Sequence, residues 1–373
     1  MKDKITYIHT SSLDSRKANL IQVLNMCKAF VENGAKVVLI LPKSKSEPSI
    51  ELDPRVTLKF FDVNHKLPSS IKYSFALNRY LNKNKLEGLV FVRQFTLVFP
   101  IQQHGYNYIY ESHNNNLFSR KYADIIFKFF LKRLIKKDNF LLFFSISGEL
   151  NKYWDRFFNF KHKKLDYYHD GIDDNMFKDV IKKEEALKLL QIKDSKRKRV
   201  TYAGSLYKDR GIHNIVKLAS DYPEVDIIVI GGPNVEIPEL KELAKGLHAS
   251  NIEFIGVVEH KQIPLYLYAS DILLAFWSNK VKTINYCSPL KVFEYMASER
   301  LIIAHAYPTI KEVLNDGNSI LINTNCYNSM KEGLQKAINT NPDQISSKAR
   351  QEVLAKYTWN KRAEYILDII KKE

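Results

Sequence analysis

Residues 5–41 read ITYIHTSSLDSRKANLIQVLNMCKAFVENGAKVVLIL and contain the repeating unit of the fold. Ile5–His9 is rich in the β-branched and aromatic residues typical of a strand. The apolar run Ala35–Leu41 predicts a second strand, and Gly34 is well placed to end a helix before it. That helix is predicted because apolar residues recur every three or four positions, at Leu20, Ile21, Leu24, Cys27 and Val31. Strand, helix and strand in this order form a βαβ unit, which implies a parallel sheet covered on both faces.

The same alternation continues along the chain and then begins again. In the first half the further strand-like runs are Leu58–Val63, Leu89–Val92, Tyr108–Tyr110 and Leu141–Ile146. In the second half they are Val200–Ala203, Asp226–Ile230, Ile252–Ile255, Ile272–Ala275, Leu301–Ala304 and Ser319–Ile322, with helix-like segments at Ile212–Ser220 and Val292–Ala297. The charged stretch Lys178–Lys198 separates the two series. The sequence therefore predicts two doubly wound α/β domains, residues 1–172 and 199–357, joined by a linker at residues 173–198.

Length and composition agree with two folded domains. The chain has 373 residues, of which 45% are hydrophobic and 26% are charged, as in ordinary globular proteins. Its cysteines, Cys27, Cys287 and Cys326, have neither metal-ligand nor disulfide spacing, which indicates free thiols in a reducing compartment. No apolar run is long enough to span a bilayer, and the N-terminus is polar where a signal peptide is apolar. We therefore expect a cytoplasmic protein.

The net charge of the chain is strongly positive. Lys and Arg number 57 and Asp and Glu number 41, which gives a formal net charge of +16. This balance favours an anionic partner, which includes nucleic acid, an acidic membrane surface and phosphorylated small substrates. A basic surface that is merely solvated is the alternative.

The turns after strands are the first places to search for a site, because ligands of open α/β sheets bind beyond the carboxyl ends of the strands. The turn after Val200–Ala203 contains the small residues Gly204 and Ser205, and Arg210 precedes the next helix. Small residues let a ligand approach the backbone, and the donor fork of an arginine suits phosphate. An ordinary glycine turn with surface cations is the alternative.

The most specific segment begins at Ser288 and reads SPLKVFEYMA. Ser288 fits a helix N-cap and Pro289 fits the first helical position, so the free amides of Leu290 and Lys291 are expected to bind phosphate. Glu294 lies farther along the helix, where it can meet a polar group just beyond the phosphates, such as a ribose diol. A capped helix with an incidental glutamate is the alternative.

A third candidate lies at the end of the strand-like run Tyr108–Tyr110. Alternation along an extended chain puts Glu111 and His113 on the same face, pointing toward the ligand-binding edge. A histidine at this place can hydrogen-bond a substrate or handle a proton. A histidine with a purely structural role is the alternative.

A basic helix is expected between residues 121 and 136. Its apolar stripe consists of Phe127, Phe130, Leu131 and Leu134. Ile125 and Phe129 project on the other side, among the lysines Lys121, Lys128, Lys132 and Lys136. A basic helix with stray apolar residues predicts contact with an anionic membrane surface. A helix packed into its own domain with a solvated basic edge is the alternative.

Taken together, these segments resemble the retaining glycosyltransferases of family 4. That family has the GT-B architecture, in which two Rossmann-like domains face each other across a cleft. The resemblance covers nearly the whole chain and also rests on Ser145–Glu149, His169–Asp173, Ile228–Gly232, Tyr266–Leu274 and Thr358–Trp359 with the final helix, which occur in the family's order and spacing. It implies that residues 1–172, with a crossover helix at 358–373, form an acceptor-side domain and that residues 199–357 bind a nucleotide-sugar donor.

The resemblance also assigns roles to particular residues. Glu294 matches a family glutamate that binds the donor ribose, Arg210 falls where the family has a diphosphate-binding lysine, and His113 falls where a histidine contacts the donor sugar. The implied catalytic residues are His113 and Glu111. The implied donor-binding residues are Gly204, Ser205, Arg210, Gly232, Ser288, Pro289, Leu290, Lys291 and Glu294, and those on the acceptor side are Ser11, Ser12, Arg16 and Asn19. No metal ion or other cofactor is expected, because cations and a helix end stabilise the departing diphosphate.

Several positions depart from the family pattern. Tyr286 stands where the first glutamate of a paired motif is expected, so a contact to the sugar hydroxyls is lost. Ser205 replaces an arginine of the first loop, and Lys291 is expected to compensate for it. Ser11 and Ser12 replace the usual diglycine after the first strand. The donor sugar is therefore not identified by the resemblance.

The expected function is a hexosyltransferase-type glycosyltransferase. It would take a UDP-sugar, or in second place a GDP-sugar, and extend a glycan or lipid-linked acceptor of the cell surface from the inner face of the membrane. The alternatives are a sugar-nucleotide epimerase of the same architecture and a non-catalytic basic protein that binds nucleotides or nucleic acid. A nicotinamide dehydrogenase is disfavoured because no Gly-x-Gly-x-x-Gly loop follows a strand, and no nucleic-acid module motif is present.

Overall fold

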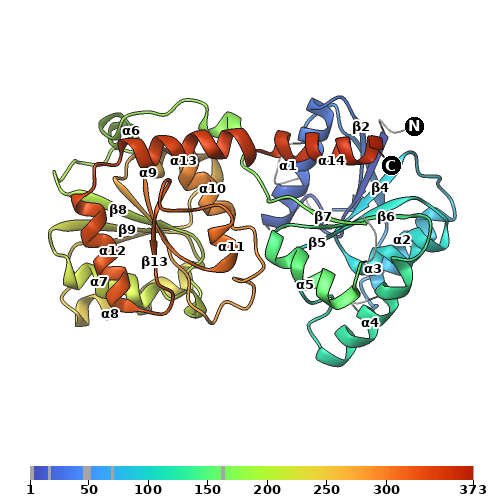
Figure 1. The fold of residues 1–373 in the computed structure, drawn as a ribbon, viewed down its shortest axis with the longest axis horizontal. Coiled ribbons are helices and arrows are strands. Elements are labelled where there is room, and N and C mark those ends of the chain that lie inside the picture. The colour runs from blue at the N-terminus through green and yellow to red at the C-terminus, as the bar shows by residue number, and fades with distance from the viewer. Residues whose placement is uncertain (1–3, 16–17, 45–51, 69–70, 161–163, 373) are drawn as a thin grey trace. The chain divides into compact units, whose positions relative to one another are not determined.

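The computed structural model describes residues 4–15, 18–44, 52–68, 71–160 and 164–372, which form two compact units. The first unit comprises Met1–Asp170, Tyr286–Ser288 and Trp359–Glu373, and the second comprises Gly171–Asn285 and Pro289–Thr358. Each unit has a central sheet with helices packed against it (Figure 1). The predicted fold class, α/β with two doubly wound sheets, is confirmed.

The sheet of the first unit has seven parallel strands in the order β3-β2-β1-β4-β5-β6-β7. They are β1 (Lys4–Ile8), β2 (Lys36–Pro42), β3 (Thr57–Phe61), β4 (Leu89–Val92), β5 (Tyr108–Ser112), β6 (Phe140–Ser145) and β7 (Leu165–Tyr167). Every residue of β4 and β5 is buried, which explains why parallel strands read as continuous apolar runs. The strand order reverses between β1 and β4, so the topological switch point of this sheet lies there.

The helices of the first unit are α1 (Ala18–Glu32), α2 (Lys72–Leu81), α3 (Phe95–Gln103), α4 (Lys121–Leu134), α5 (Gly148–Phe158) and α14 (Trp359–Lys372). Ser147 caps α5, since its Oγ accepts a hydrogen bond from the amide of Leu150 at 3.2 Å. The last helix of the chain, α14, packs against α1 (Figure 1). The two ends of the described chain therefore belong to one folded unit.

The sheet of the second unit has six parallel strands in the order β10-β9-β8-β11-β12-β13. They are β8 (Lys198–Ala203), β9 (Val225–Ile230), β10 (Ile252–Gly256), β11 (Ile272–Ala275), β12 (Leu301–His305) and β13 (Ile320–Ile322). Its helices are α6 (Lys183–Leu189), α7 (Ile212–Asp221), α8 (Ile237–Gly246), α9 (Ile263–Tyr268), α10 (Leu290–Ala297), α11 (Pro308–Lys311), α12 (Tyr327–Asn339) and α13 (Asp343–Lys356). The switch point lies between β8 and β11.

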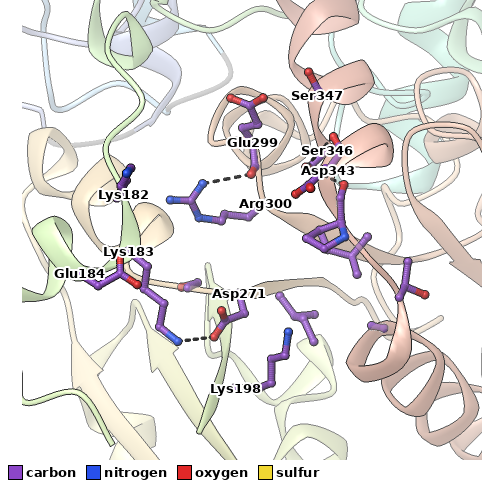
Figure 2. Close-up of a pocket in the computed structure, with 16 residues that line it drawn as sticks. Lys182, Lys183, Glu184, Lys198, Asp271, Glu299, Arg300, Asp343, Ser346 and Ser347 are labelled. Atoms are coloured by element: carbon purple, nitrogen blue, oxygen red, sulfur yellow. Dashed lines mark hydrogen bonds and ion pairs between the residues drawn. The ribbon is translucent and has the colours of Figure 1, made fainter. Parts of the chain in front are cut away.

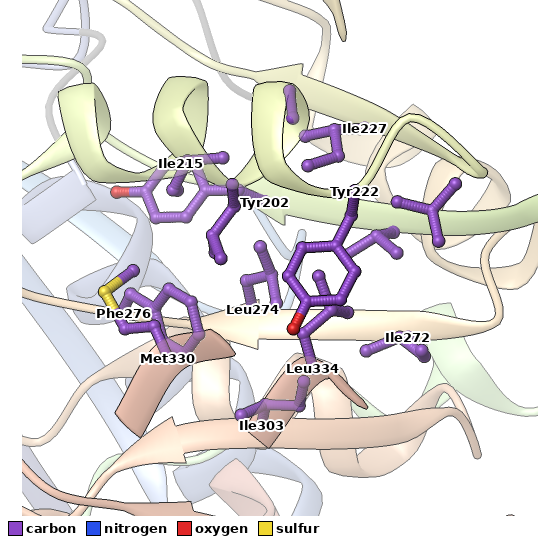
Figure 3. Packing of buried hydrophobic residues seen from close by; sticks show 14 of the residues in the cluster. Tyr202, Ile215, Tyr222, Ile227, Ile272, Leu274, Phe276, Ile303, Met330 and Leu334 are labelled. Atoms are coloured by element: carbon purple, nitrogen blue, oxygen red, sulfur yellow. The ribbon is translucent and has the colours of Figure 1, made fainter. Parts of the chain in front are cut away.

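One face of this second sheet packs against α7 and α12 to form a large apolar core. Figure 3 shows Ile215 of α7 and Leu334 of α12 close to side chains of β9, β11 and β12. Successive side chains of a strand point to opposite faces, so residues two apart, such as Ile272 and Leu274, enter the same core. Tyr222 is at the rim of the cluster, and its hydroxyl donates a hydrogen bond to the carbonyl of Lys331 at 2.8 Å.

The predicted linker at residues 173–198 is wrong. Residues 173–198 belong to the second unit and form a short 3-10 helix (Asp174–Phe177) and α6. Phe177, Ala186 and Leu187 in this stretch are buried, and the many charged residues around them concealed this apolar set in the sequence. Conversely, Tyr286–Ser288 belongs to the first unit, where the carbonyl of Tyr286 accepts a hydrogen bond from Ser147 Oγ at 2.8 Å.

Glycines bring three backbone segments together at the carboxyl edge of the second sheet. Gly231 has a φ of +127°, and a Cβ built on it would lie 1.9 Å from the carbonyl oxygen of Gly204. The amide of Gly231 donates to the carbonyl of Gly256 at 2.8 Å. Only a residue without a side chain permits this approach, so the glycine after β9 is required by the fold.

We expect Gly231→Ala to lower the free energy of unfolding by at least about 2 kcal/mol, because the methyl group overlaps a backbone carbonyl at a positive φ. Gly246→Ala at the end of α8 is the matched control. Apart from its own turn of helix, no atom of the described residues lies within 4 Å of the place that its methyl group would take. Urea unfolding of both variants measures the difference. Equal stability of the two variants would contradict the packing argument.

Candidate functional site

The carboxyl edge of the second sheet carries the segment that the sequence singled out. Helix α10 begins at Leu290, and Pro289 occupies its N-cap position, so the prediction of Ser288 as N-cap is wrong by one residue. The Ser288 side chain is used elsewhere, because its Oγ accepts the amide of Asp170 at 2.8 Å. The N-cap residue makes no side-chain hydrogen bond to α10, so the positive end of the helix, with the amides of Leu290 and Lys291, is not neutralised by its own cap.

Aromatic rings hold the cation of Lys291 at this edge. Its Nζ lies 4.2 Å from the ring centroids of Tyr202 and of Trp277, and 3.4 Å from the carbonyl oxygen of Phe276. Tyr202 belongs to β8, and Phe276 and Trp277 directly follow β11, so the ammonium group stands at the switch point of the sheet. Ring faces and a carbonyl oxygen attract an ammonium group without contributing an opposite full charge, which suits an anionic ligand.

Glu294 lies one turn farther along α10 and has a partner that sequence analysis missed. His260 Nε2 lies 3.0 Å from Glu294 Oε1. This hydrogen bond raises the pKa of His260, whose burial acts in the opposite direction. The side chain of Glu294 is 15% exposed and that of His260 is 45% exposed, so both are accessible to a ligand. His260 lies 34 positions before Glu294, and no local spacing pointed to it.

The turn after β8 contributes buried polar atoms that have no hydrogen-bond partner within the described residues. Ser205 Oγ and Arg210 Nε are buried and make no hydrogen bond within the described part of the chain. Arg210 Nε is 3.6 Å from Asp209 Oδ1. The amide of Leu206 donates to the carbonyl of Gly232 at 2.7 Å and so ties this turn to the diglycine after β9. Buried donors without partners are costly unless a ligand or water satisfies them, which supports a binding role for this turn.

His305 at the end of β12 is a further polar residue that sequence analysis missed. Its Nδ1 accepts the amide of Trp277 at 3.1 Å, and its ring stacks on Phe276 with centroids 4.8 Å apart. The proton therefore lies on Nε2, which is buried and has no partner among the described residues. Burial lowers the pKa of His305 to about 4, so the ring is neutral at physiological pH.

The carboxyl edge of the first sheet brings together Glu111 and His113 as predicted, with Arg93 added. Glu111 Oε1 accepts a hydrogen bond from His113 Nε2, and Arg93 Nη2 lies 2.9 Å from His113 Nδ1. Both ring nitrogens are thus engaged, while 19% of the His113 side chain remains exposed. The Glu111 side chain is only 3% exposed, which is too buried for direct contact with a substrate. Its predicted role as a catalytic residue is therefore not supported.

The predicted acceptor-side residues are only partly brought to this edge. The carbonyl of Asn19 accepts a hydrogen bond from Arg93 Nη1 at 3.2 Å, which places Asn19 beside the site. Ser12 Oγ donates to Asp14 Oδ1 within its own loop, and Ser11 is half-buried in the same loop. Arg16 lies outside the described residues. His9, which follows β1, joins the edge through a hydrogen bond of 3.1 Å between its Nδ1 and Gln94 Nε2.

The predicted membrane-facing lysine Lys128 on α4 is buried, so this assignment is wrong. Its Nζ lies 2.7 Å from Asp124 Oδ2 and donates to the Tyr153 hydroxyl at 2.9 Å. Asp124 in turn accepts the amide of Phe118 at 3.2 Å and secures the preceding loop. Phe130 of the predicted apolar stripe is 41% exposed, whereas Leu131 of the same stripe is buried. Lys121, Phe129, Lys132 and Lys136 are exposed as predicted.

The second unit also has a pocket of about 540 Å³ at the opposite, amino-terminal edge of its sheet. Figure 2 shows Lys183 paired with Asp271, and the guanidinium of Arg300 donating to the Glu299 carbonyl. Lys198 and Asp343 also line it. Acidic and basic groups are balanced here, and none of the residues predicted for the site lines it. This pocket is therefore separate from the candidate site.

No group of three or more His, Cys, Asp or Glu side chains in the described ranges is arranged to hold a metal ion. Among the helices that the structure describes, none has the length and apolar character needed to cross a membrane.

We expect His305→Gln to reduce the acid sensitivity of the fold. Burial lowers the pKa of His305 in the folded state. The stability that neutral His305 contributes to the fold is therefore fully present above the unfolded pKa of about 6.5 and is lost as the pH falls toward 4. At about pH 5 this loss is about 2 kcal/mol, and glutamine keeps an acceptor for the Trp277 amide without titrating. Urea unfolding at neutral pH and at about pH 5 measures it. Equal acid losses in the wild type and the variant would contradict the prediction.

Comparisons with known proteins show which proteins the chain resembles. Residues 191–368, somewhat under half of the chain, match a protein family described as glycosyl transferase-like. An uncharacterized glycosyltransferase of Methanocaldococcus jannaschii is 29% identical over 170 residues, which are 44% of this chain and 42% of that protein. In this match the chain thus spans less than half of its relative's length.

Solved structures resemble the chain along nearly its whole length. Sucrose-phosphate synthase of Thermosynechococcus elongatus superposes with a TM-score of 0.78 at 15% identity, over 99% of this chain and 98% of that one. HepE of Anabaena, solved in complex with UDP, superposes with a TM-score of 0.76 at 14% identity, over 99% of this chain and 100% of that one. At such identities the likeness establishes the fold. The chain has the GT-B fold, and its second half is similar in sequence to glycosyltransferases.

Proposed function

We propose that the protein is a glycosyltransferase that transfers a sugar from a nucleoside diphosphate donor to a glycan or lipid-linked acceptor, with retention of configuration. The observation that carries the proposal is the arrangement on α10, where the start of the helix and the ring-held Lys291 stand one turn before Glu294. A diphosphate and a ribose occur in this order in a nucleotide sugar. The pathway we propose is the synthesis of a cell-surface polysaccharide or glycolipid.

The positive groups of the second unit suit a departing diphosphate. Lys291 supplies a full charge, the start of α10 supplies amides and a helix dipole, and Arg210 supplies a donor fork whose Nε has no hydrogen-bond partner within the described residues. Catalysis in this proposal is positioning of the donor together with stabilisation of the charge that develops on the leaving diphosphate. Protein groups alone supply that charge stabilisation, so the proposal requires no metal ion.

Glu294 suits the ribose of the donor. A carboxylate accepts hydrogen bonds from both hydroxyls of a diol, and the hydrogen bond from His260 is made to Oε1. A uridine nucleotide is favoured over a guanosine nucleotide, because structures of the fold relative HepE were solved with UDP and with UDP-glucose. We propose that the exposed edge of His113 in the first unit contacts a sugar, with Glu111 acting through His113 rather than on the substrate.

We expect UDP at a hundred times its dissociation constant to stabilise the protein by about 2.7 kcal/mol, and Glu294→Ala to abolish most of this stabilisation. A thermal-shift series with UDP, GDP, ADP, NAD and a short DNA duplex measures it. Glu242→Ala on α8 is the control, since Glu242 is an exposed glutamate of the same unit. No shift with any nucleotide, or a salt-sensitive shift with DNA alone, would refute the proposed donor site.

The exposed face of α4 suits an anionic membrane surface. Ile125, Ile126 and Phe129 are 55–56% exposed on it, a wider apolar strip than the sequence predicted. Lys132 and Lys136 are exposed beside them. An apolar strip with flanking cations inserts at the level of the lipid headgroups, where each lysine near an anionic surface contributes about 1 kcal/mol. We propose that this face docks the protein at the inner leaflet, next to a lipid-linked acceptor.

We expect Lys132→Glu with Lys136→Glu to weaken binding to phosphatidylserine-containing vesicles at least about tenfold, because attraction becomes repulsion at both positions. Vesicle co-sedimentation at low and moderate salt measures it. The matched control is Lys241→Glu with Lys245→Glu, which makes the same charge change on an exposed face of α8. Equal binding of both double variants would show that α4 is not the contact.

A further inference from the structure

The buried Arg362 of the last helix is linked to His113 through the carboxylate of Glu111. Arg362 Nη2 of α14 lies 3.0 Å from Glu111 Oε2, and the other oxygen of Glu111 accepts a hydrogen bond from His113 Nε2. On its far side, His113 Nδ1 lies 2.9 Å from Arg93 Nη2. A guanidinium only donates hydrogen bonds, so Nδ1 is the acceptor and the proton of the neutral ring lies on Nε2.

The same arginines are joined a second time, which closes a ring of polar contacts. Arg93 Nη2 also donates to Gln22 Oε1 at 2.8 Å, and Gln22 Nε2 donates to Asp170 Oδ2 at 3.1 Å. Asp170 Oδ1 lies 3.4 Å from Arg362 Nη1. The ring unites residues from α1, β5, α14 and the segments after β4, β5 and β7, all within the first unit.

Arg362 is the more deeply buried of the two arginines in this ring, and the other, Arg93, lies 3.5 Å through its Nε from Glu111 Oε1. The Arg362 side chain is 1% exposed and faces two buried carboxylates, those of Glu111 and Asp170. Burial lowers the pKa of Arg362, but these two carboxylates more than offset the effect, so the group stays charged. Burial raises the pKa of Glu111, whereas Arg362, followed by His113 and Arg93, lowers it below the ordinary value. Without Arg362 the buried carboxylate would lose its strongest stabilising partner.

We propose that Arg362 is a positioning residue, which keeps Glu111 ionised and in place so that Glu111 holds the His113 ring in one tautomer and one orientation. The assignment of His113 to a sugar rests on the proposed function, whereas the tautomer and orientation of its ring do not. Helix α14 therefore contributes a residue to the candidate site at the carboxyl edge of the first sheet, in addition to packing against α1.

The decisive experiment follows the ring nitrogens of His113 by NMR in the full-length protein, with the signals assigned through His113→Gln. The wild type is expected to show one tautomer with the proton on Nε2. The charged groups that face His113 are Arg93, Glu111 and, farther away, Asp170. In Arg362→Met the negative charge of Glu111 is less compensated, so both tautomers are expected to appear and the pKa of His113 is expected to rise.

Turnover of a UDP-sugar supplies the second readout. For Arg362→Met we expect kcat to fall about a hundredfold with little change in KM, and the acid limb of the pH–rate profile to move to higher pH. Arg362→Lys keeps the charge but not the fork that spans two carboxylates, so an intermediate effect is expected. Lys361→Met, which changes an exposed cation of the same helix, is expected to behave as the wild type.

The outcomes separate this proposal from the proposed function. A folded Arg362→Met variant whose His113 signals and titration match the wild type would overturn the positioning role. If that variant does not fold, Glu111→Gln with Arg362→Met removes both charges of the pair; the pKa of His113 is then expected to fall, and an unchanged pKa would overturn the proposal. If the His113 signals change in Arg362→Met but the wild type transfers no sugar, the role of Arg362 is supported and the proposed function is refuted.

Discussion

The structure depends on the requirement that a parallel sheet be covered on both faces. Parallel strands need crossover helices, and the crossovers bring the carboxyl ends of all strands to one edge. In the second unit this edge collects Ser205 after β8, Trp277 after β11 and His305 at the end of β12. In the first unit it collects Arg93 after β4 and Glu111 at the end of β5. Side chains far apart in sequence therefore meet because of connectivity, before any specific contact is considered.

A second rule is that burial of a charged side chain is costly unless a side chain of opposite charge lies beside it. The pair of Asp124 and Lys128 satisfies this rule within one helix and secures a loop. The pair of Glu111 and Arg362 satisfies it across 251 positions of sequence and holds a histidine. In both pairs, removal of one partner alone is costly because it leaves the other charge buried without compensation. The first has structural consequences, whereas we propose that the second has functional ones.

The sequence predicted the residues that sit in local motifs better than those that act through distant partners. Lys291, Glu294 and Arg210 were found because each lies close to the start of a helix that follows a strand along the chain. His260 and Arg362 were missed, since their importance comes from Glu294 and Glu111, which are remote in sequence. Two further errors concern α4. Lys128 was expected to be exposed because it is charged, but it pairs with Asp124 inside the first unit, and Phe130 of the predicted apolar stripe is exposed.

By itself, the sequence determined the alternation of strands and helices, the two parallel sheets and the position of the segment Ser288–Ala297 that leads into and forms α10. These features follow from periodicity, apolar runs and capping residues, all of which act over a few neighbouring positions. Only the tertiary structure decided which unit residues 173–198 and 286–288 join, which face of α4 is exposed and which charges are paired. The physical reason is that burial and ion pairing depend on distances between segments, and the energy of a side chain is set by its neighbours in space.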